Sequence, residues 1–246
     1  MPGKEKLYLY NNIFDTGQNV LNYILYYPLW FKRTHKFEKI SGIPTITDGH
    51  HDIHVTYMLD NFNLDSIFLD IGANFGKYCV PMALTGYTTL AFEPVKTHLR
   101  CLEKSKIKNK IKNLIIEPYA LFDRSSFKNM YIPSFTDTAT LVKRRVESNK
   151  SLFLNGDCLL EESVTTMRFD DYVKNNDIIN FNQIKLVKID VEGVELEVLS
   201  GMYNFLEKSK NIHLIIENDG TITPKTKIEK FLLELGFKDI SGTIEY

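Results

Sequence analysis

The chain has 246 residues, an apolar share of 43% and a formal net charge of −1. This length fits one domain with an extension or a small pair of domains, and the apolar share suffices for a full core. A nearly neutral chain has no overall field that recruits nucleic acid, so we expect no nucleic-acid partner. Cys79, Cys101 and Cys158 are widely spaced and follow no metal-ligand pattern, which favours a reduced protein in the cytoplasm.

Residues 1–62 form an aromatic-rich extension in which Tyr, Phe and Trp alternate with polar residues. Its first residues lack the pattern of a signal peptide, and the apolar stretch 20–31 is too short to span a bilayer. We expect this extension to pack on the following domain or to form a wall of its substrate site. The alternative is contact with a membrane surface, at the inner face. Helical spacing predicts a helix over 53–64 that leads into a sheet.

Strands and helices alternate over residues 63–246, with an insertion around 119–168. The strands are apolar runs rather than alternating patterns, which is typical of a parallel sheet covered on both faces. We therefore predict an α/β, Rossmann-like fold with a mostly parallel seven-stranded sheet. The predicted strands are 67–71, 89–92, 114–117, 186–191 and 213–217, with extra strands over 128–133 and 163–168. The predicted helices are 76–84, 95–108, 169–176, 194–208 and 224–235, and 237–246 is predicted as an edge strand or hairpin.

Pro81 falls within the first of these helices. The helix therefore starts late, near Val80, or has a distorted opening turn.

An acidic residue and a turn of small residues follow the first strand: Asp70, Gly72, Ala73, Asn74 and Gly76. Glycines allow a ligand to approach the backbone closely, and this layout suits a nucleotide-like ligand at the carboxyl end of a parallel sheet. The glycine spacing does not match the dinucleotide pattern, and a carboxylate at this place repels a pyrophosphate. The same carboxylate attracts the ammonium group of S-adenosylmethionine. The turn thus favours S-adenosylmethionine over a nicotinamide dinucleotide.

The second strand ends in Glu93, followed by Pro94. A carboxylate at the tip of this strand commonly binds the hydroxyls of a ribose, so we predict that role for Glu93. Pro94 is expected to open the next helix, where its missing N–H costs little. The alternative for Glu93 and Asp70 is that both are simply polar strand ends.

Four motifs together resemble the FkbM-type S-adenosylmethionine-dependent methyltransferases. The matching residues are Asp70-Ile71-Gly72-Ala73-Asn74-Phe75-Gly76, Phe92-Glu93-Pro94, Thr165 to Tyr172, and Lys188-Ile189-Asp190-Val191-Glu192-Gly193-Val194-Glu195 with Val198-Leu199-Ser200-Gly201. The resemblance covers about residues 50 to 220. It implies a class I methyltransferase fold and methyl transfer to a hydroxyl oxygen of a sugar or another polar natural product.

The resemblance also assigns cofactor contacts. It places Asp70, Gly72 and Asn74 in the first turn and Glu93 at the ribose, and Ala120 is the best match for a contact with adenine. Glu117, three residues earlier, departs from the family's pattern.

Asp190 and Glu192 follow the fourth core strand, where a general base would lie beside the methyl group. Lys188 has period-two spacing with Asp190, so both are expected on one side of the sheet, where Lys188 orients the acceptor or pairs with a carboxylate. The alternative for Glu192 is a favourable charge at a helix N-terminus. Glu195 and Glu197 are expected to face solvent.

A second set of oxygen ligands could hold Mg²⁺ or another divalent metal: Asp190, Glu217, Asn218 and Asp219. The alternative is that Asn218, Asp219 and Gly220 form a turn. His50, His51 and His54 are a third cluster, for which we favour a solvent-facing role over a metal or base.

These features predict an S-adenosylmethionine-dependent O-methyltransferase that acts on a sugar hydroxyl in a surface polysaccharide or a glycosylated natural product. The expected partner is a small-molecule or glycan acceptor, and the sequence sets no oligomeric state. The alternatives are a methyltransferase with another small-molecule or protein target, a non-catalytic nucleotide-binding module, and a dinucleotide oxidoreductase.

Overall fold

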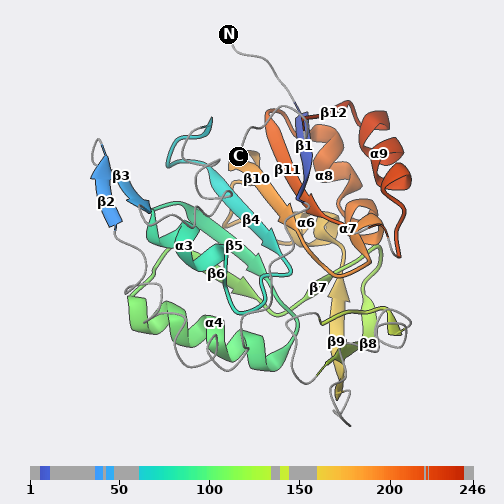
Figure 1. Ribbon diagram of the computed structural model, residues 1–246, viewed down its shortest axis with the longest axis horizontal. Coiled ribbons are helices and arrows are strands. Elements are labelled where there is room, and N and C mark those ends of the chain that lie inside the picture. Colours follow the sequence, from blue (N-terminus) through green and yellow to red (C-terminus); the bar gives the residue numbers. More distant parts are fainter. Residues whose placement is uncertain are drawn as a thin grey trace.

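A computed structural model describes residues 6–11, 37–40, 43–46, 61–133, 139–143, 160–218, 220 and 222–240. Its centre is a seven-stranded sheet of order β12-β1-β11-β10-β4-β5-β6 (Figure 1). These strands are β1 (Lys6–Asn11), β4 (Ile67–Ile71), β5 (Thr88–Phe92), β6 (Leu114–Glu117), β10 (Ile184–Ile189), β11 (Ile212–Glu217) and β12 (Phe237–Asp239). Each neighbouring pair is parallel, so the predicted parallel sheet is confirmed.

The chain runs outward from β4 through β5 to β6 and then returns to β10 on the other side of β4. The strand order therefore reverses between β4 and β10. In open α/β sheets such a switch point leaves a crevice beyond the carboxyl ends of the strands, where ligands bind. Asp70 on β4 and Asp190 just after β10 lie at this point.

Strand β1 comes from the segment assigned to the N-terminal extension, and the sequence predicted no strand there. It lies between β11 and β12, with pairs from Lys6↔Ile212 to Asn11↔Glu217. Residues 6–11 of the extension are therefore part of the central sheet. A separate antiparallel hairpin joins β2 (Phe37–Ile40) and β3 (Ile43–Ile46). The helix predicted over 53–64 and the cluster of His50, His51 and His54 lie largely or wholly outside the described residues.

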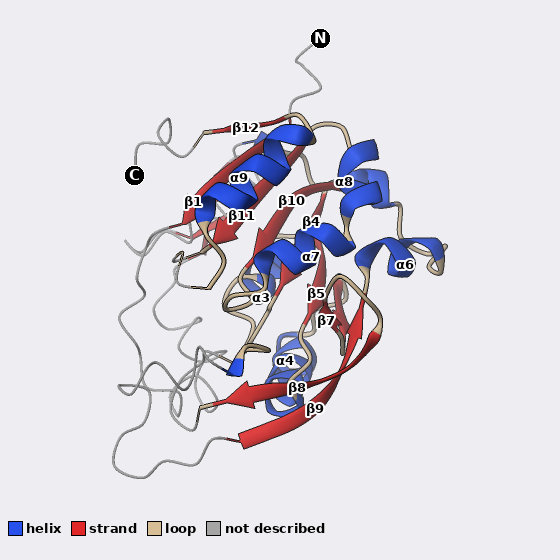
Figure 2. Ribbon diagram, turned by 90° about the vertical axis from the view of Figure 1, so that its right-hand side faces the viewer, coloured by secondary structure: helices blue, strands red, loops and turns tan. Residues whose placement is uncertain are grey.

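Helices cover both faces of the sheet, as predicted (Figure 2). One face carries α3 (Cys79–Leu84) and α4 (Lys96–Asn109), and the other carries α6 (Phe169–Lys174), α7 (Glu195–Gly201), α8 (Tyr203–Lys208) and α9 (Lys225–Glu234). Alternate residues of β4 divide between the two cores. Leu69 packs with the core under α7 to α9, and Phe68 packs with Met82 of α3. All five residues of β4 are buried, which explains the apolar run in the sequence.

Helix α3 begins at Cys79, so Pro81 lies in its first turn, where its missing N–H is tolerated. The late start predicted for this helix is confirmed. Helix α4 begins at Lys96 with Val95 as its N-cap. Pro94 therefore precedes the helix by two residues, and its predicted role as the first helical residue is wrong.

The single helix predicted over 194–208 is two helices, α7 and α8, that break at Met202. A Cβ atom on Gly201 would lie 2.0 Å from the carbonyl oxygen of Phe122, so α7 ends against the backbone of another segment. The buried carboxylate of Asp170 accepts hydrogen bonds from the backbone N–H groups of Asn204 (3.1 Å) and Phe205 (2.9 Å). These bonds cap the start of α8 in place of helical bonds.

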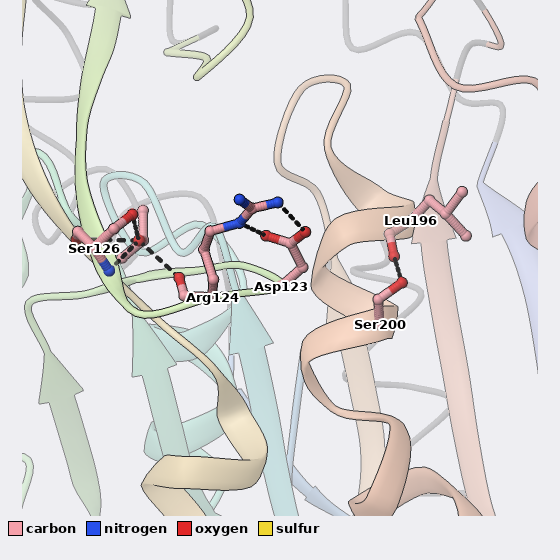
Figure 3. A network of polar contacts seen from close by, with 6 residues as sticks. Asp123, Arg124, Ser126, Leu196 and Ser200 are labelled. Carbon is pink, nitrogen blue, oxygen red and sulfur yellow. Dashed lines mark hydrogen bonds and ion pairs between the residues drawn. The ribbon is translucent and has the colours of Figure 1, made fainter.

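The insertion contains a three-stranded sheet of order β7-β9-β8, formed by β7 (Ala120–Leu121), β8 (Ser126–Ile132) and β9 (Leu160–Met167). Figure 3 shows the turn between β7 and β8 beside α7, with Arg124 paired to Asp123 at 3.1 Å. Thr166 of β9 anchors this turn, since it donates to the carbonyl oxygen of Arg124 and accepts from the backbone of Ser126. The small sheet therefore packs against the main domain at the ends of β5 and β6.

Candidate active site

The turn after β4 is fastened to the end of β5. The N–H groups of Gly72 and Ala73 both donate to the carbonyl oxygen of Phe92, each at 3.1 Å. Gly72 has φ +78°, Gly76 has φ +97° and Asn74 has φ +50°, so the turn depends on left-handed backbone that glycine adopts at little cost. These bonds fix a tight loop at the carboxyl edge of the sheet.

Gly72 also contacts β10. A Cβ atom at Gly72 would lie 1.9 Å from the carbonyl oxygen of Asp190, and the Asp190 N–H donates to the carbonyl oxygen of Ile71 at 3.1 Å. The glycine therefore lets the turn after β4 lie directly on the backbone after β10. The residues predicted for cofactor and for catalysis meet at this contact.

A buried cation joins the two strands. The ammonium of Lys188 lies 3.5 Å from a carboxylate oxygen of Asp70 and 3.1 Å from one of Asp190, and it donates to the carbonyl oxygen of Gly72 at 3.1 Å. It also lies 4.7 Å from the centroid of the Tyr78 ring. Lys188 and Asp70 are almost fully buried, whereas the side chain of Asp190 is 23% exposed. Of the three groups, Asp190 is the one that solvent or a ligand reaches.

The charge of Lys188 is well defined. Burial alone would lower the pKa of its ammonium, but neighbouring carboxylates raise this pKa above its ordinary value. These carboxylates are those of Asp190, Asp70 and Glu217. Lys188 therefore stays protonated at neutral pH and acts as a cation, not as a base. Burial and the nearby Asp70 carboxylate also raise the pKa of the Cys79 thiol, which stays neutral.

Glu93 lies at the tip of β5, as predicted, and its carboxylate is buried. One oxygen accepts from the Asn74 N–H at 2.7 Å, and the other accepts from the Val95 N–H at 2.9 Å and lies 3.2 Å from Nδ1 of His98. Glu93 thus ties the first turn to the start of α4. An ionised carboxylate has about four acceptor positions, so one remains for a ribose hydroxyl.

The segment from Asp190 to Gly193 forms a second turn with left-handed backbone, at Glu192 (φ +58°) and Gly193 (φ +112°). The carbonyl oxygen of Glu192 accepts from the Thr140 hydroxyl at 2.7 Å, and that of Gly193 accepts from the Thr223 hydroxyl at 3.1 Å. Thr140 lies in the insertion and Thr223 follows β11. No motif in the sequence indicated either residue.

Glu195 was predicted to face solvent, and this prediction is wrong, because Glu195 is 1% exposed. It is the first residue of α7, and its carboxylate turns back to accept from the Gly193 N–H at 2.8 Å and from the Asn218 side chain at 3.0 Å. Burial raises its pKa above the ordinary value. The available signal was its position two residues after Gly193, where an acid in the first turn of a helix can bind free N–H groups.

The predicted metal ligands are only partly described. Glu217 ends β11 and adds to the field on Lys188, and the Asn218 amide is shared between Glu195 and the Gly220 N–H at 2.7 Å. Asp219 lies outside the described residues. Across the described parts of the chain, no group of three His, Cys, Asp or Glu side chains could hold a metal ion.

Ala120 is buried in β7. It belongs to the same small core as Val95, which lies two residues after Glu93 in the sequence. Glu117, the residue that departs from the expected pattern, accepts a hydrogen bond from the Tyr172 hydroxyl at 2.9 Å. Burial is the largest cause that raises the pKa of Tyr172, so this hydroxyl remains a donor. Glu117 is therefore explained by a contact with α6.

The family model for the methyltransferase FkbM domain matches residues 70–238. The chain belongs to the FkbM methyltransferase family. It is accordingly an S-adenosylmethionine-dependent methyltransferase, and its parallel α/β sheet is the Rossmann-like fold that the sequence predicted. A comparison of the FkbM chain with curated proteins found no match.

Several solved structures are similar to this FkbM chain. An rRNA methylase from Streptococcus thermophilus has 12% identity and a TM-score of 0.42, over 74% of this chain and 76% of that chain. A precorrin-6y C5,15-methyltransferase from Geobacter metallireducens has 14% identity and a TM-score of 0.40, over 82% and 77%. A human methyltransferase 10 domain containing protein has 11% identity and a TM-score of 0.36, over 86% and 72%. These likenesses say nothing about the acceptor.

The residues at this site fit S-adenosylmethionine. Glu93 keeps an acceptor position for a ribose hydroxyl, and Gly72 lets the first turn lie against the backbone of Asp190 at the switch point. The contact of Asp70 with the cofactor's ammonium stays a prediction, and the structure adds that this carboxylate already faces Lys188. In the described ranges, every helix is too short or too polar to cross a membrane.

Proposed function

We propose that this FkbM methyltransferase transfers a methyl group to a hydroxyl oxygen of a sugar, in a polysaccharide or a glycosylated natural product. The observation that supports this most is the partly exposed carboxylate of Asp190, held at the switch point beside the first turn. S-adenosylmethionine supplies an electrophilic methyl group bound to a sulfonium. A sugar hydroxyl is a weak nucleophile, so the protein must take up its proton.

Asp190 is the proposed base. Lys188 engages one of its carboxylate oxygens, Oδ2, at 3.1 Å, and the contacts among the described residues leave Oδ1 for the acceptor. Lys188 stays charged, so its role is to orient Asp190 and to balance the buried charge of Asp70. This arrangement holds the base rigidly, and alignment of reactants can supply effective molarities of about 10⁵–10⁸ M.

Glu192 is a second acceptor-side residue, because it lies two residues after Asp190 on the same turn. We propose that it binds a further hydroxyl of the sugar. A sugar presents several hydroxyls, and two carboxylates on one turn provide acceptors for two of them. A divalent metal held by Asp190, Glu217 and Asp219 is the alternative way to stabilise the charge on the acceptor oxygen. Sensitivity of turnover to chelation tests this alternative.

The expected partner and cellular compartment follow from the same proposal. A soluble sugar or a glycan is the expected partner, and the cytoplasm is the expected compartment, with contact at the inner face of a membrane for a lipid-linked acceptor. A nitrogen or protein-side-chain target is the alternative, because the same carboxylate could accept a proton from an ammonium group.

The test is a screen of purified protein, S-adenosylmethionine and a panel of mono- and oligosaccharides, read as production of S-adenosylhomocysteine. Asp190→Asn should lower turnover about 100-fold or more, because general-base catalysis contributes about 10²–10⁴. Its affinity for S-adenosylhomocysteine should stay within about twofold.

Asp123→Asn, which changes a partly exposed aspartate paired with Arg124 outside the site, is the matched control and should keep full turnover. Equal losses of turnover and cofactor affinity in Asp190→Asn would assign Asp190 a structural role. Methylation of amines but of no sugar would overturn the proposed acceptor class. Loss of activity with a strong chelator would establish a metal requirement, and activity that survives would rule it out.

A further inference from the structure

Side chains from the insertion, from the loop after β11 and from the start of α7 hold the backbone of the turn at 190–193. Thr140 donates to the carbonyl oxygen of Glu192, Thr223 donates to that of Gly193, and Glu195 accepts from the Gly193 N–H. Thr140 and Glu195 are each 1% exposed, and Thr223 is 7% exposed. The backbone of the turn that carries the proposed acceptor-binding residues is therefore held by three buried side chains.

Glu192 has a backbone conformation that is costly for a residue with a side chain, at φ +58°. Among the described residues, Asn74, Lys110 and Asn211 share a positive φ without being glycine. Lys110 is the left-handed C-cap of α4, where this conformation is ordinary. Such strain persists only where the surroundings enforce it, and it clusters at functional sites.

Thr140 is well placed to hold Glu192 in this left-handed conformation. Its backbone forms two hydrogen bonds with Tyr131 of β8, at 2.8 and 3.0 Å. Its hydroxyl oxygen accepts from the Val142 N–H at 3.0 Å and donates its single proton to the carbonyl oxygen of Glu192 at 2.7 Å. Since the hydroxyl has one proton and a fixed donor on its other side, its direction is determined.

We propose that Thr140 is a positioning residue through which the insertion sets the acceptor side of the site. Its hydroxyl holds Glu192 in the left-handed conformation and so directs the side chains of Asp190 and Glu192 toward the acceptor. This inference rests on the proposed function, because it takes that turn as the acceptor side. It gives the insertion a defined part in the reaction, although Thr140 itself touches neither substrate.

The first measurement needs no acceptor. Amide hydrogen exchange over residues 188–195 is compared in the full chain with bound S-adenosylhomocysteine, for wild type, Thr140→Val and Thr140→Ser. Thr140→Val keeps the shape of the side chain but removes the hydroxyl that donates to the carbonyl oxygen of Glu192, so exchange in this peptide should rise about tenfold. Thr140→Ser keeps the hydroxyl and should match wild type.

Thr85→Val is the matched control. Thr85 is 2% exposed and its hydroxyl donates to the carbonyl oxygen of Met82 at 2.7 Å, so it loses the same kind of bond at the end of α3. It should leave exchange over 188–195 unchanged. If Thr140→Val fails to fold, Thr140→Ala, which adds no bulk, takes its place in the same comparison.

The second measurement uses an acceptor found in the sugar screen. Thr140→Val should lower kcat about tenfold, with the KM for S-adenosylmethionine within about twofold, and Thr140→Ser should restore kcat. Unchanged exchange and unchanged kcat in Thr140→Val would overturn the inference, as would a Thr140→Ser variant that behaves like Thr140→Val. If wild type methylates no sugar, the proposed function fails, while the exchange comparison still decides the role of Thr140.

Discussion

The cofactor half and the acceptor half of this site are built in different ways. The cofactor half consists of the turn at 70–76 and Glu93. Its backbone N–H groups donate to Phe92, Glu93 and Ala73, which are close in sequence, and the carbonyl oxygen of Gly72 accepts from Lys188, 116 residues later. The acceptor half consists of the turn at 190–193. It is held by Thr140, 52 residues before its partner, and by Thr223, 30 residues after its partner.

Because of this difference, the cofactor half and the acceptor half differ in how readily their sequences can change. The contacts of the cofactor half join residues of the sequence motifs themselves, including Lys188. The acceptor half depends on an insertion and on a loop after β11, which are segments that vary most readily because they lie outside the central sheet. We infer that the acceptor can change while the cofactor site stays as it is.

Gly72→Ala is the substitution that should most strongly break the link between the halves. A methyl group at Gly72 would meet the carbonyl oxygen of Asp190 at 1.9 Å, on backbone with φ +78°. We expect the free energy of unfolding to fall by more than about 3 kcal/mol, with loss of S-adenosylhomocysteine binding. Urea unfolding and calorimetry would measure the two effects.

Gly236→Ala provides the control for Gly72→Ala. Gly236 has nearly the same φ, +79°, but a Cβ atom there would meet nothing within 4 Å. It should cost only about 1–2 kcal/mol, the price of the backbone conformation alone. Equal losses in the two variants would mean that the contact between the halves is not tight.

Lys188→Met should have the next largest effect. The variant leaves the fully buried carboxylate of Asp70 without its ammonium, which costs about 3–5 kcal/mol in comparable buried pairs. Because the pKa of Lys188 is raised, its contribution is complete below the ordinary value of 10.5 and is lost only as pH rises through the higher folded value. The stability difference between wild type and the double variant Lys188→Met with Asp70→Asn, in which neither position titrates, should therefore be constant from about pH 6 to 9.

The double variant Lys188→Met with Asp70→Asn sharpens this test. It should be more stable than Lys188→Met alone, since no buried carboxylate remains without a cation. A stability difference between wild type and this double variant that changes steeply near neutral pH would show that Lys188 titrates there, against the role of a permanent cation.

The sequence predicted most of the core, because its signals are local. The apolar runs of β4, β5, β6, β10 and β11 identify buried parallel strands, and Asp70 near the end of β4 and Glu93 just after β5 stand at a readable spacing. The insertion strands were also predicted near their observed positions. These features depend on periodicity and on turn residues, which a single sequence shows.

Other features depend on contacts that no local pattern records. The break between α7 and α8 follows from the backbone of Phe122 and the carboxylate of Asp170, which lie far away in sequence. Strand β1 pairs with β11 across the whole domain. Glu195 looked like an exposed helical acid, yet it is buried and accepts from the side chain of Asn218, 23 residues later. Tertiary contacts decided each of these cases.

The central claim is that this site binds S-adenosylmethionine through Glu93. Its most direct test is calorimetric titration of S-adenosylhomocysteine and of NAD into wild type, Glu93→Gln and Glu117→Gln. Glu117→Gln makes the same change at the end of the neighbouring strand, where a glutamine can still accept from Tyr172. The account predicts micromolar binding of S-adenosylhomocysteine but not of NAD, weakened about tenfold or more in Glu93→Gln and unchanged in Glu117→Gln. Equal affinity in all three proteins, or preferential binding of NAD, would contradict it.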